Sequence, residues 1–233
     1  MIPLHDDNPT HIFPLLTIAF IVACVLAFFW QASVGPQGNE MIIYALGVIP
    51  AVLLDKVALP PELAVLPPVA TIFTSMFLHG GFMHLAGNML YLWIFGNNVE
   101  DAMGHRRFVI FYLICGVVAV FGQVAQNPDS QIPMIGASGA ISGVLGAYLL
   151  LYPHARVLVL IPLGFFMQMV RIPASWVLIF WFVWQLISSA MDSGEGGGVA
   201  WFAHIGGFIA GMVLVPFFKD KDVPLFHKAR GFR

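Results

Sequence analysis

A serine, two histidines and an asparagine are the residues of this 233-residue chain whose types and positions suit acyl-transfer chemistry. Ser138 begins an apolar stretch between Gly136 and Gly139, so we expect its hydroxyl at a helix start. Unpaired backbone N–H groups and the positive end of the helix dipole are found there, and both are suited to holding an oxyanion. The flanking glycines would let a peptide backbone approach closely. The structural alternative is an ordinary helix N-cap serine.

His204 is the candidate base for this hydroxyl. A buried histidine beside glycines is by itself a common packing residue. However, small residues repeat every four positions both around His204 and after Ser138. These two stripes are Ala203, Gly207 and Gly211, and Gly139, Gly143 and Ala147. If the stripes meet, two helices pack backbone to backbone, and Ser138 and His204 come within hydrogen-bond reach.

His84 and Asn88 form a second candidate group. They are four residues apart, so a helix places them on one face about one turn apart. Together they offer hydrogen-bond donors to one small volume, although a hydrogen bond between packed helices is an equally simple use of such a pair. The other amides inside apolar stretches are Gln123 and Gln185.

The composition requires lipid around these residues. Apolar residues make up 59% of the chain and charged residues only 9%, and a soluble domain of this length could not bury that much apolar surface. No linker or charge block divides the sequence, which predicts a single domain over residues 1–233. The net charge of -2, without a long basic run, gives no reason to expect nucleic acid as a partner.

Six stretches approach the roughly 20 apolar residues that a transmembrane helix needs. They cover residues 12–32, 82–100, 107–126, 136–153, 172–191 and 199–218. Residues 41–54 are too few to cross and are expected to form a helix in the membrane interface. Residues 157–170 are also too few, so the arginines that bracket them, Arg156 and Arg171, share one side. The predicted fold is an all-α bundle of six transmembrane helices.

The positive charges orient this bundle. With both termini cytoplasmic, all Lys and Arg residues except Lys56 fall in cytoplasmic loops or in the C-terminal tail, as the positive-inside rule expects. The same topology places His84, Ser138 and His204 near the outer ends of their helices, at a similar shallow depth. The spans carry no central Asp, Glu, Lys or Arg, which counts against an ion pump or a voltage sensor.

Three motifs resemble the rhomboid family of intramembrane serine proteases. They are His84-Leu85-Ala86-Gly87-Asn88, Gly136-Ala137-Ser138-Gly139 and His204-Ile205-Gly206-Gly207, in the family's order on the second, fourth and sixth helices. The resemblance covers residues 12–218 and implies a rhomboid-like bundle. It implies Ser138 as nucleophile and His204 as general base of a Ser-His dyad. It also implies an oxyanion hole formed by His84, Asn88 and the backbone N–H of Ser138.

The resemblance further implies transmembrane proteins as substrates, cut near the outer membrane face. We expect a multi-pass protein of the bacterial cytoplasmic (inner) membrane, surrounded by the lipid bilayer. Neither a metal nor an organic cofactor is needed for such a reaction, and the remaining histidines form no compact ligand spacing.

The sequence departs from the family pattern at two places. An aromatic residue often follows the nucleophile by four positions, and here that position is Ser142; a Trp-Arg pair in the first outer loop is also missing. A Ser-His-Asp triad would have to recruit Asp129, Asp192 or Glu195 from outer loops, so a dyad is the simpler interpretation.

Two other functions compete with proteolysis. One is a catalytically silent rhomboid-like protein that binds or escorts membrane proteins, but such a protein has no chemical need for the full set of polar residues. The other is a small-molecule transporter, which would show an internal repeat or a polar track across the bilayer, and the sequence has neither.

Overall fold

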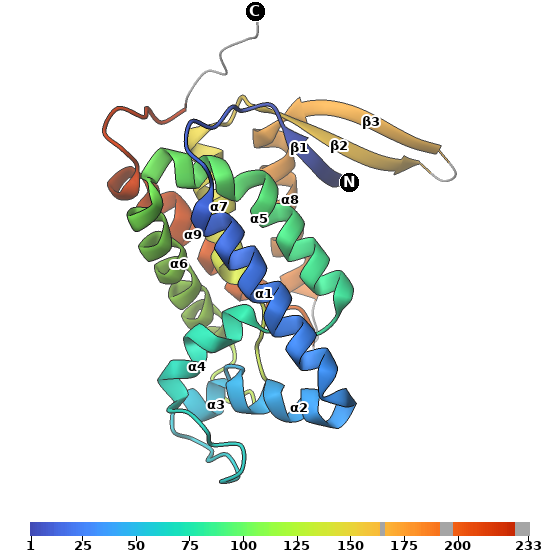
Figure 1. Ribbon diagram of the computed structural model, residues 1–233, viewed down its shortest axis with the longest axis vertical. Helices are drawn as coiled ribbons and strands as arrows, with labels where there is room; N and C mark the ends of the chain where they lie inside the picture. Colours follow the sequence, from blue (N-terminus) through green and yellow to red (C-terminus); the bar gives the residue numbers. More distant parts are fainter. Residues whose placement is uncertain (164–165, 192–197, 227–233) are drawn as a thin grey trace, which may run out of the picture.

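The computed structural model describes residues 1–163, 166–191 and 198–226, and these form a mostly helical bundle with a small sheet at one end (Figure 1). The long helices are α1 (Leu15–Ser33), α5 (Phe82–Met103), α6 (His105–Gln126), α7 (Ser138–Leu151), α8 (Ala174–Met191) and α9 (Trp201–Phe218). The short ones are α2 (Gly35–Leu46), α3 (Pro50–Leu53), α4 (Pro68–Thr74) and a 3₁₀ turn, η1 (Ser75–Phe77). The strands are β1 (Ile2–Asp6), β2 (Arg156–Leu163) and β3 (Phe166–Pro173).

The six long helices begin and end within a few residues of the six predicted spans. Among the described residues, four of them are long and apolar enough to cross a membrane alone: α1, α6, α8 and α9. Helix α5 passes the same test together with Pro68–Phe77, from which it is bent by 82°. Helix α7 is apolar but has only 14 residues. The structure therefore supports a membrane bundle with four or five candidate spans.

Helix α7 lies in the middle of the bundle, with every residue from Gly139 to Tyr148 buried. Its small residues meet those of α9 directly. A Cβ atom on Gly207 would collide with the carbonyl oxygen of Gly139, and one on Gly211 would collide with the backbone of Gly143. The predicted contact between the two small-residue stripes is confirmed, and it brings the two backbones together as such stripes do in membranes.

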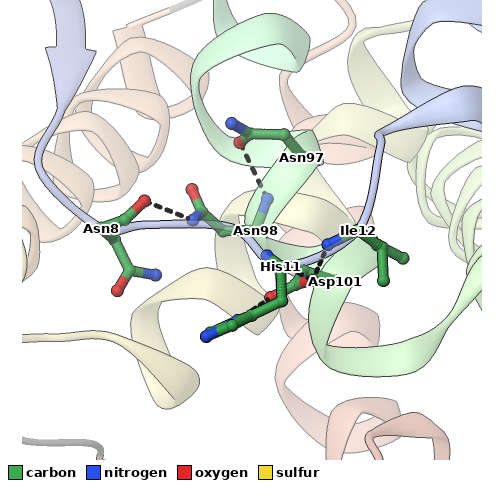
Figure 2. Close-up of polar contacts among 6 residues, drawn as sticks. All are labelled: Asn8, His11, Ile12, Asn97, Asn98 and Asp101. Atoms are coloured by element: carbon green, nitrogen blue, oxygen red, sulfur yellow. Dashed lines mark hydrogen bonds and ion pairs between the residues drawn. The ribbon is translucent and has the colours of Figure 1, made fainter.

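Acidic residues at the end of α5 hold the start of α1. The buried carboxylate of Glu100 accepts hydrogen bonds from the backbone N–H groups of Leu16 (2.8 Å) and Thr17 (2.8 Å), which the helix itself leaves without acceptors. Figure 2 shows the preceding segment lying on the same helix, where Asp101 accepts from the backbone N–H groups of His11 (3.0 Å) and Ile12 (2.9 Å). The N-terminal segment is thereby fixed to the end of α5.

The all-α prediction is wrong at residues 157–163 and 166–170, which form most of the antiparallel hairpin strands β2 and β3, with β1 added as a third strand. Val157 and Val159 are buried and alternate with partly exposed leucines, which is the period of a strand. Both alternate positions are apolar, so the sequence shows a continuous apolar run that does not separate strand from helix. Arg156 and Arg171 lie at the same end of the hairpin, where Arg171 pairs with Leu158.

The predicted helix at residues 41–54 is interrupted. Helix α2 ends at Leu46 and α3 starts at Pro50, and between them Val48 pairs with Met134 in the segment that precedes α7. Helices α2, α3 and α4 lie at the end of the bundle opposite to the sheet (Figure 1). This pairing fixes the chain that leads into Ser138.

Candidate active site

A cavity of about 720 Å³ contains all four residues singled out in the sequence. Helix α5 contributes His84 and Asn88, the start of α7 contributes Ser138, and the start of α9 contributes His204. Further polar residues line the same cavity, namely Gln123, Asn127 and Ser130. The cavity thus combines a mostly apolar lining with several polar groups, and such groups can hold the water that hydrolysis would need.

Ser138 and His204 are in direct contact. The distance between Ser138 Oγ and His204 Nε2 is 2.8 Å, which is a hydrogen bond between a hydroxyl and an imidazole. Ser138 is the first residue of α7 and is half-buried, whereas His204 lies in the first turn of α9 and is 9% exposed. The small-residue contact between α7 and α9 sets this distance, because larger side chains would hold the two helix starts apart.

His84 faces Ser138 from helix α5. The backbone N–H of Gly80 lies 3.4 Å from its Nδ1 atom, so Nδ1 accepts and Nε2 carries the ring hydrogen. A Cβ atom on Gly136 would lie 2.8 Å from His84 Nε2, and Gly136 has a φ of +124°. A glycine is needed there for both reasons, since any side chain would displace the imidazole and strain the backbone.

Asn88 and the backbone of α7 complete the set of donors. The Asn88 side-chain NH₂ donates one hydrogen to the carbonyl of His84, at 2.9 Å, and it carries a second hydrogen for a ligand. The N–H of Ser138 belongs to the first turn of α7, where helix geometry provides no acceptor. A carbonyl bound beside Ser138 would thus have a hydroxyl and a base on one side and N–H donors on the other.

Comparison with known proteins identifies the family of this chain. The family model for the rhomboid domain matches residues 68–220, which is well over half of the chain and includes all three motifs. The chain belongs to the rhomboid family.

Several characterised proteins are similar to this rhomboid chain. The rhomboid protease GluP of Bacillus subtilis is 33% identical over 201 residues, which cover 86% of this chain and 35% of GluP. Rhomboid protein 1, mitochondrial, of Saccharomyces cerevisiae is 30% identical over 149 residues, covering 61% of this chain and 40% of that protein. The human presenilin-associated rhomboid-like protein, mitochondrial, is 36% identical over 90 residues, which cover 37% of this chain and 23% of that protein. The chain therefore spans less than half the length of these relatives.

The rhomboid site also contains a residue to which the sequence analysis gave no role. Gln185 of α8 is 4% exposed, and its Oε1 atom lies 2.8 Å from His204 Nδ1. The signal in the sequence was an amide inside an apolar span, where polar side chains usually face the bundle interior. Its partner was not predictable, because it depends on how α8 and α9 pack.

The structure also bears on the alternative of an acidic third residue. Asp129 is exposed and pairs with Lys56, with 2.6 Å between Oδ1 and Nζ, so it does not contact His204. Asp192 and Glu195 lie outside the described residues. The ring nitrogen that a triad carboxylate would contact is occupied by Gln185 instead.

Ser142, which stands where the family often has an aromatic residue, donates a hydrogen bond to the carbonyl of Ser138, at 2.6 Å. It therefore supports the first turn of α7. The aromatic contact with His204 comes instead from Trp181 of α8, at a centroid distance of 5.8 Å, and from Trp201, at 6.3 Å. The aromatic neighbours of the His204 imidazole are thus two tryptophans, neither of which lies on α7.

Proposed function

We propose that this rhomboid protein is an intramembrane serine endopeptidase that cuts transmembrane segments of other membrane proteins. The observation that carries the proposal is the 2.8 Å contact between Ser138 Oγ and His204 Nε2 inside a cavity of a membrane bundle. A hydroxyl paired with a neutral imidazole is the arrangement that converts serine into a nucleophile. The rhomboid protease GluP, which is similar over most of this chain, is itself named as a protease.

The proposed reaction has two stages. The oxygen of Ser138 attacks the carbonyl carbon of the scissile bond while His204 Nε2 takes the hydroxyl proton. The resulting oxyanion would be held by N–H donors from His84, Asn88 and the Ser138 backbone, and His204 then gives its proton to the leaving amine. Water attacks the acyl-serine in the second stage, again with His204 as base, and releases the new carboxylate and free Ser138.

Substrate choice follows from the chemistry of a helix in lipid. A regular transmembrane helix keeps its carbonyls hydrogen-bonded, so the scissile segment must unwind before Ser138 can reach it. Small or helix-breaking residues lower the cost of this unwinding, since Gly and Pro are the poorest helix formers. We therefore expect substrates with such residues near the outer end of their helix.

The competing function is a catalytically silent rhomboid-like protein that binds or escorts membrane proteins. Binding alone needs an apolar groove and a few polar contacts. Binding does not need a histidine that is hydrogen-bonded to a serine hydroxyl through one ring nitrogen and to an amide through the other. His204 has this arrangement, with Ser138 at Nε2 and Gln185 at Nδ1. The site geometry therefore favours the endopeptidase.

We infer that α7 is the fourth of six spans and that both termini are cytoplasmic, as in a protein of a bacterial inner membrane. Basic residues support the orientation. Arg107, at the start of α6, lies near the end of α9, with its Nη2 atom 3.4 Å from Asp220 Oδ2. Arg156 and Arg171 lie in the sheet, at this same end of the bundle (Figure 1). Such clustering of basic residues is typical of the cytoplasmic face.

The direct test is cleavage of a model single-span substrate by the purified chain in proteoliposomes. Ser138→Ala and His204→Ala should each lower the rate by at least about 10³-fold, because neither the nucleophile nor its base has a substitute. Ser189→Ala is the matched control, since this serine donates to the carbonyl of Leu186 in its own helix and, among the described residues, has no hydrogen bond to the site. Unchanged melting temperatures would show that the variants are folded, and undiminished cleavage by Ser138→Ala would refute the proposal.

A further inference from the structure

The wall of the site that faces His204 is built by α8. Trp181 and Gln185 are four residues apart on this helix, so they lie on one face about one turn apart, and both contact the imidazole. Much of the rest of the helix exposes large apolar side chains, as expected for a surface in contact with lipid. These are Trp176, Ile179, Phe180, Val183, Trp184, Leu186 and Ile187.

Gln185 departs from the pattern of this helix. The other buried residues of α8, Ala174, Val177 and Leu178, are small or aliphatic and lie in its first two turns. Gln185 lies in the second half of the helix, yet it is 4% exposed and its amide is satisfied at both ends. A buried amide in an apolar segment is costly unless each polar atom has a partner, so its placement at His204 is specific.

The hydrogen-bond directions from Gln185 through His204 to Ser138 follow from one group that can only accept. The carbonyl oxygen of Trp181 only accepts, and it lies 3.2 Å from Gln185 Nε2, so that nitrogen is the donor and Oε1 faces the histidine. An amide oxygen also only accepts, so His204 Nδ1 must carry the ring hydrogen. In a neutral imidazole Nε2 is then unprotonated and accepts the hydroxyl hydrogen of Ser138.

We propose that Gln185 is the positioning residue that holds His204 in its Nδ1–H tautomer and turns Nε2 toward Ser138. Its effect on catalysis rests on the proposed endopeptidase function, but its effect on the tautomer does not. The amide takes the place that a carboxylate has in a triad, and it orients the ring without adding a charge. The Trp181 ring contacts the same imidazole from one turn away on α8.

The tautomer is measurable without any substrate. We would record ¹⁵N spectra of histidine-labelled protein in detergent micelles and assign the His204 signals by their loss in His204→Ala. The native chain should show a protonated Nδ1 and an unprotonated Nε2. Gln185→Leu removes the acceptor at similar volume, so the signals should move toward the Nε2–H tautomer that imidazole prefers in water. An unchanged tautomer in Gln185→Leu would overturn the proposal.

Cleavage rates give a second readout. Gln185→Leu should lower kcat about 10- to 100-fold with KM nearly unchanged, since the base is misplaced but the groove is intact. Gln185→Glu keeps an acceptor oxygen and should recover kcat to within about tenfold of the native rate. Gln168→Leu, the same change at an exposed position of β3, should alter neither kcat nor the tautomer.

The outcomes separate this inference from the proposed function. If Ser138→Ala cleaves normally, the endopeptidase assignment fails, while the tautomer measurement still decides the role of Gln185. If Ser138 is essential but Gln185→Leu retains the native kcat, only the Gln185 inference fails. Gln185→Met replaces Gln185→Leu in both measurements if the leucine variant does not fold, as judged by its melting temperature.

Discussion

At the scale of single residues, the site relies on neutral groups. A neutral amide, Gln185, contacts the imidazole of His204 where a triad would place a carboxylate. An ionised carboxylate at a 4% exposed position would carry a large desolvation cost, whereas an amide with both ends satisfied does not. The amide, however, adds no negative charge to stabilise the imidazolium. Stabilisation of the transition state must then depend strongly on the oxyanion donors.

Asn88→Ala tests this dependence. We expect kcat to fall about 10²-fold with KM changed by less than about threefold, because the lost hydrogen bond forms only when the oxyanion forms. Steady-state kinetics on a model transmembrane substrate would measure both constants. Asn97→Ala, on the same helix beyond the cavity-lining residues, is the matched control and should leave both unchanged. An effect confined to KM would place Asn88 in substrate binding instead.

His84, Ser138 and His204 were identifiable from the sequence because they lie near the outer ends of apolar spans at a similar depth. Asn88 was identifiable because it lies one turn from His84 on the same helix face. Gln185 interrupts a span as well, but no spacing rule connects it to His204, since the contact depends on the rotation of α8 about its axis. The aromatic neighbours of His204 were also not predictable. The sequence shows that position 142 lacks a ring, but only packing shows that Trp181 and Trp201 supply one.

At the scale of elements, the contact of α7 with α9 decides whether the site exists. Gly207 and Gly211 of α9 lie directly against the backbone of α7 at Gly139 and Gly143. Backbone atoms cannot move aside as a flexible side chain can, so added volume must push the helices apart. This contact was predictable because the small residues repeat at the helical period. The β-hairpin was not, since its sequence is apolar at consecutive positions.

Gly211→Val should therefore destabilise the bundle by about 1–3 kcal/mol or more, the usual cost of overpacking, and should lower activity by separating Ser138 from His204. Thermal unfolding in detergent, followed by circular dichroism, would measure the loss of stability. Gly87→Ala is the control on α5, because a Cβ atom there would meet nothing within 4 Å. It should unfold at the native temperature or slightly higher, since alanine favours helix. Equal melting temperatures for Gly211→Val and the native chain would contradict the account of this contact.

At the scale of the whole molecule, the two ends of the bundle differ in construction. At the end with the sheet, charged residues tie the N-terminal segment to α5, with Glu100 and Asp101 holding the start of α1. At the other end, short helices and irregular segments surround the cavity, and the bridge between Val48 and Met134 is one of their few ladder contacts. The end with the sheet thus fixes the start of α1, and the end with the short helices contributes residues that line the cavity.

The predicted topology rests on span length and charge, because lipid requires satisfied backbone hydrogen bonds and cytoplasmic loops collect basic residues. It can be tested by labelling single cysteines with a membrane-impermeant maleimide in intact cells. Native Cys24 and Cys115 are buried, at 1% and 0% exposure, and should not react. A cysteine at the exposed position Gln131 should be labelled from outside, and one at the exposed position His154 only after permeabilisation. The reverse pattern would invert the bundle and move the site to the cytoplasmic face.

The central claim is that Ser138 is a nucleophile because His204 is its base, and covalent labelling tests it most directly. A fluorophosphonate reacts with an activated serine and adds a defined mass to the peptide that contains it. We expect Ser138 to be labelled in the native chain and the labelling to be almost completely lost in His204→Ala. Labelling of Ser138 at the same rate in both proteins would contradict it, because the hydroxyl would then react without the imidazole that lies 2.8 Å away.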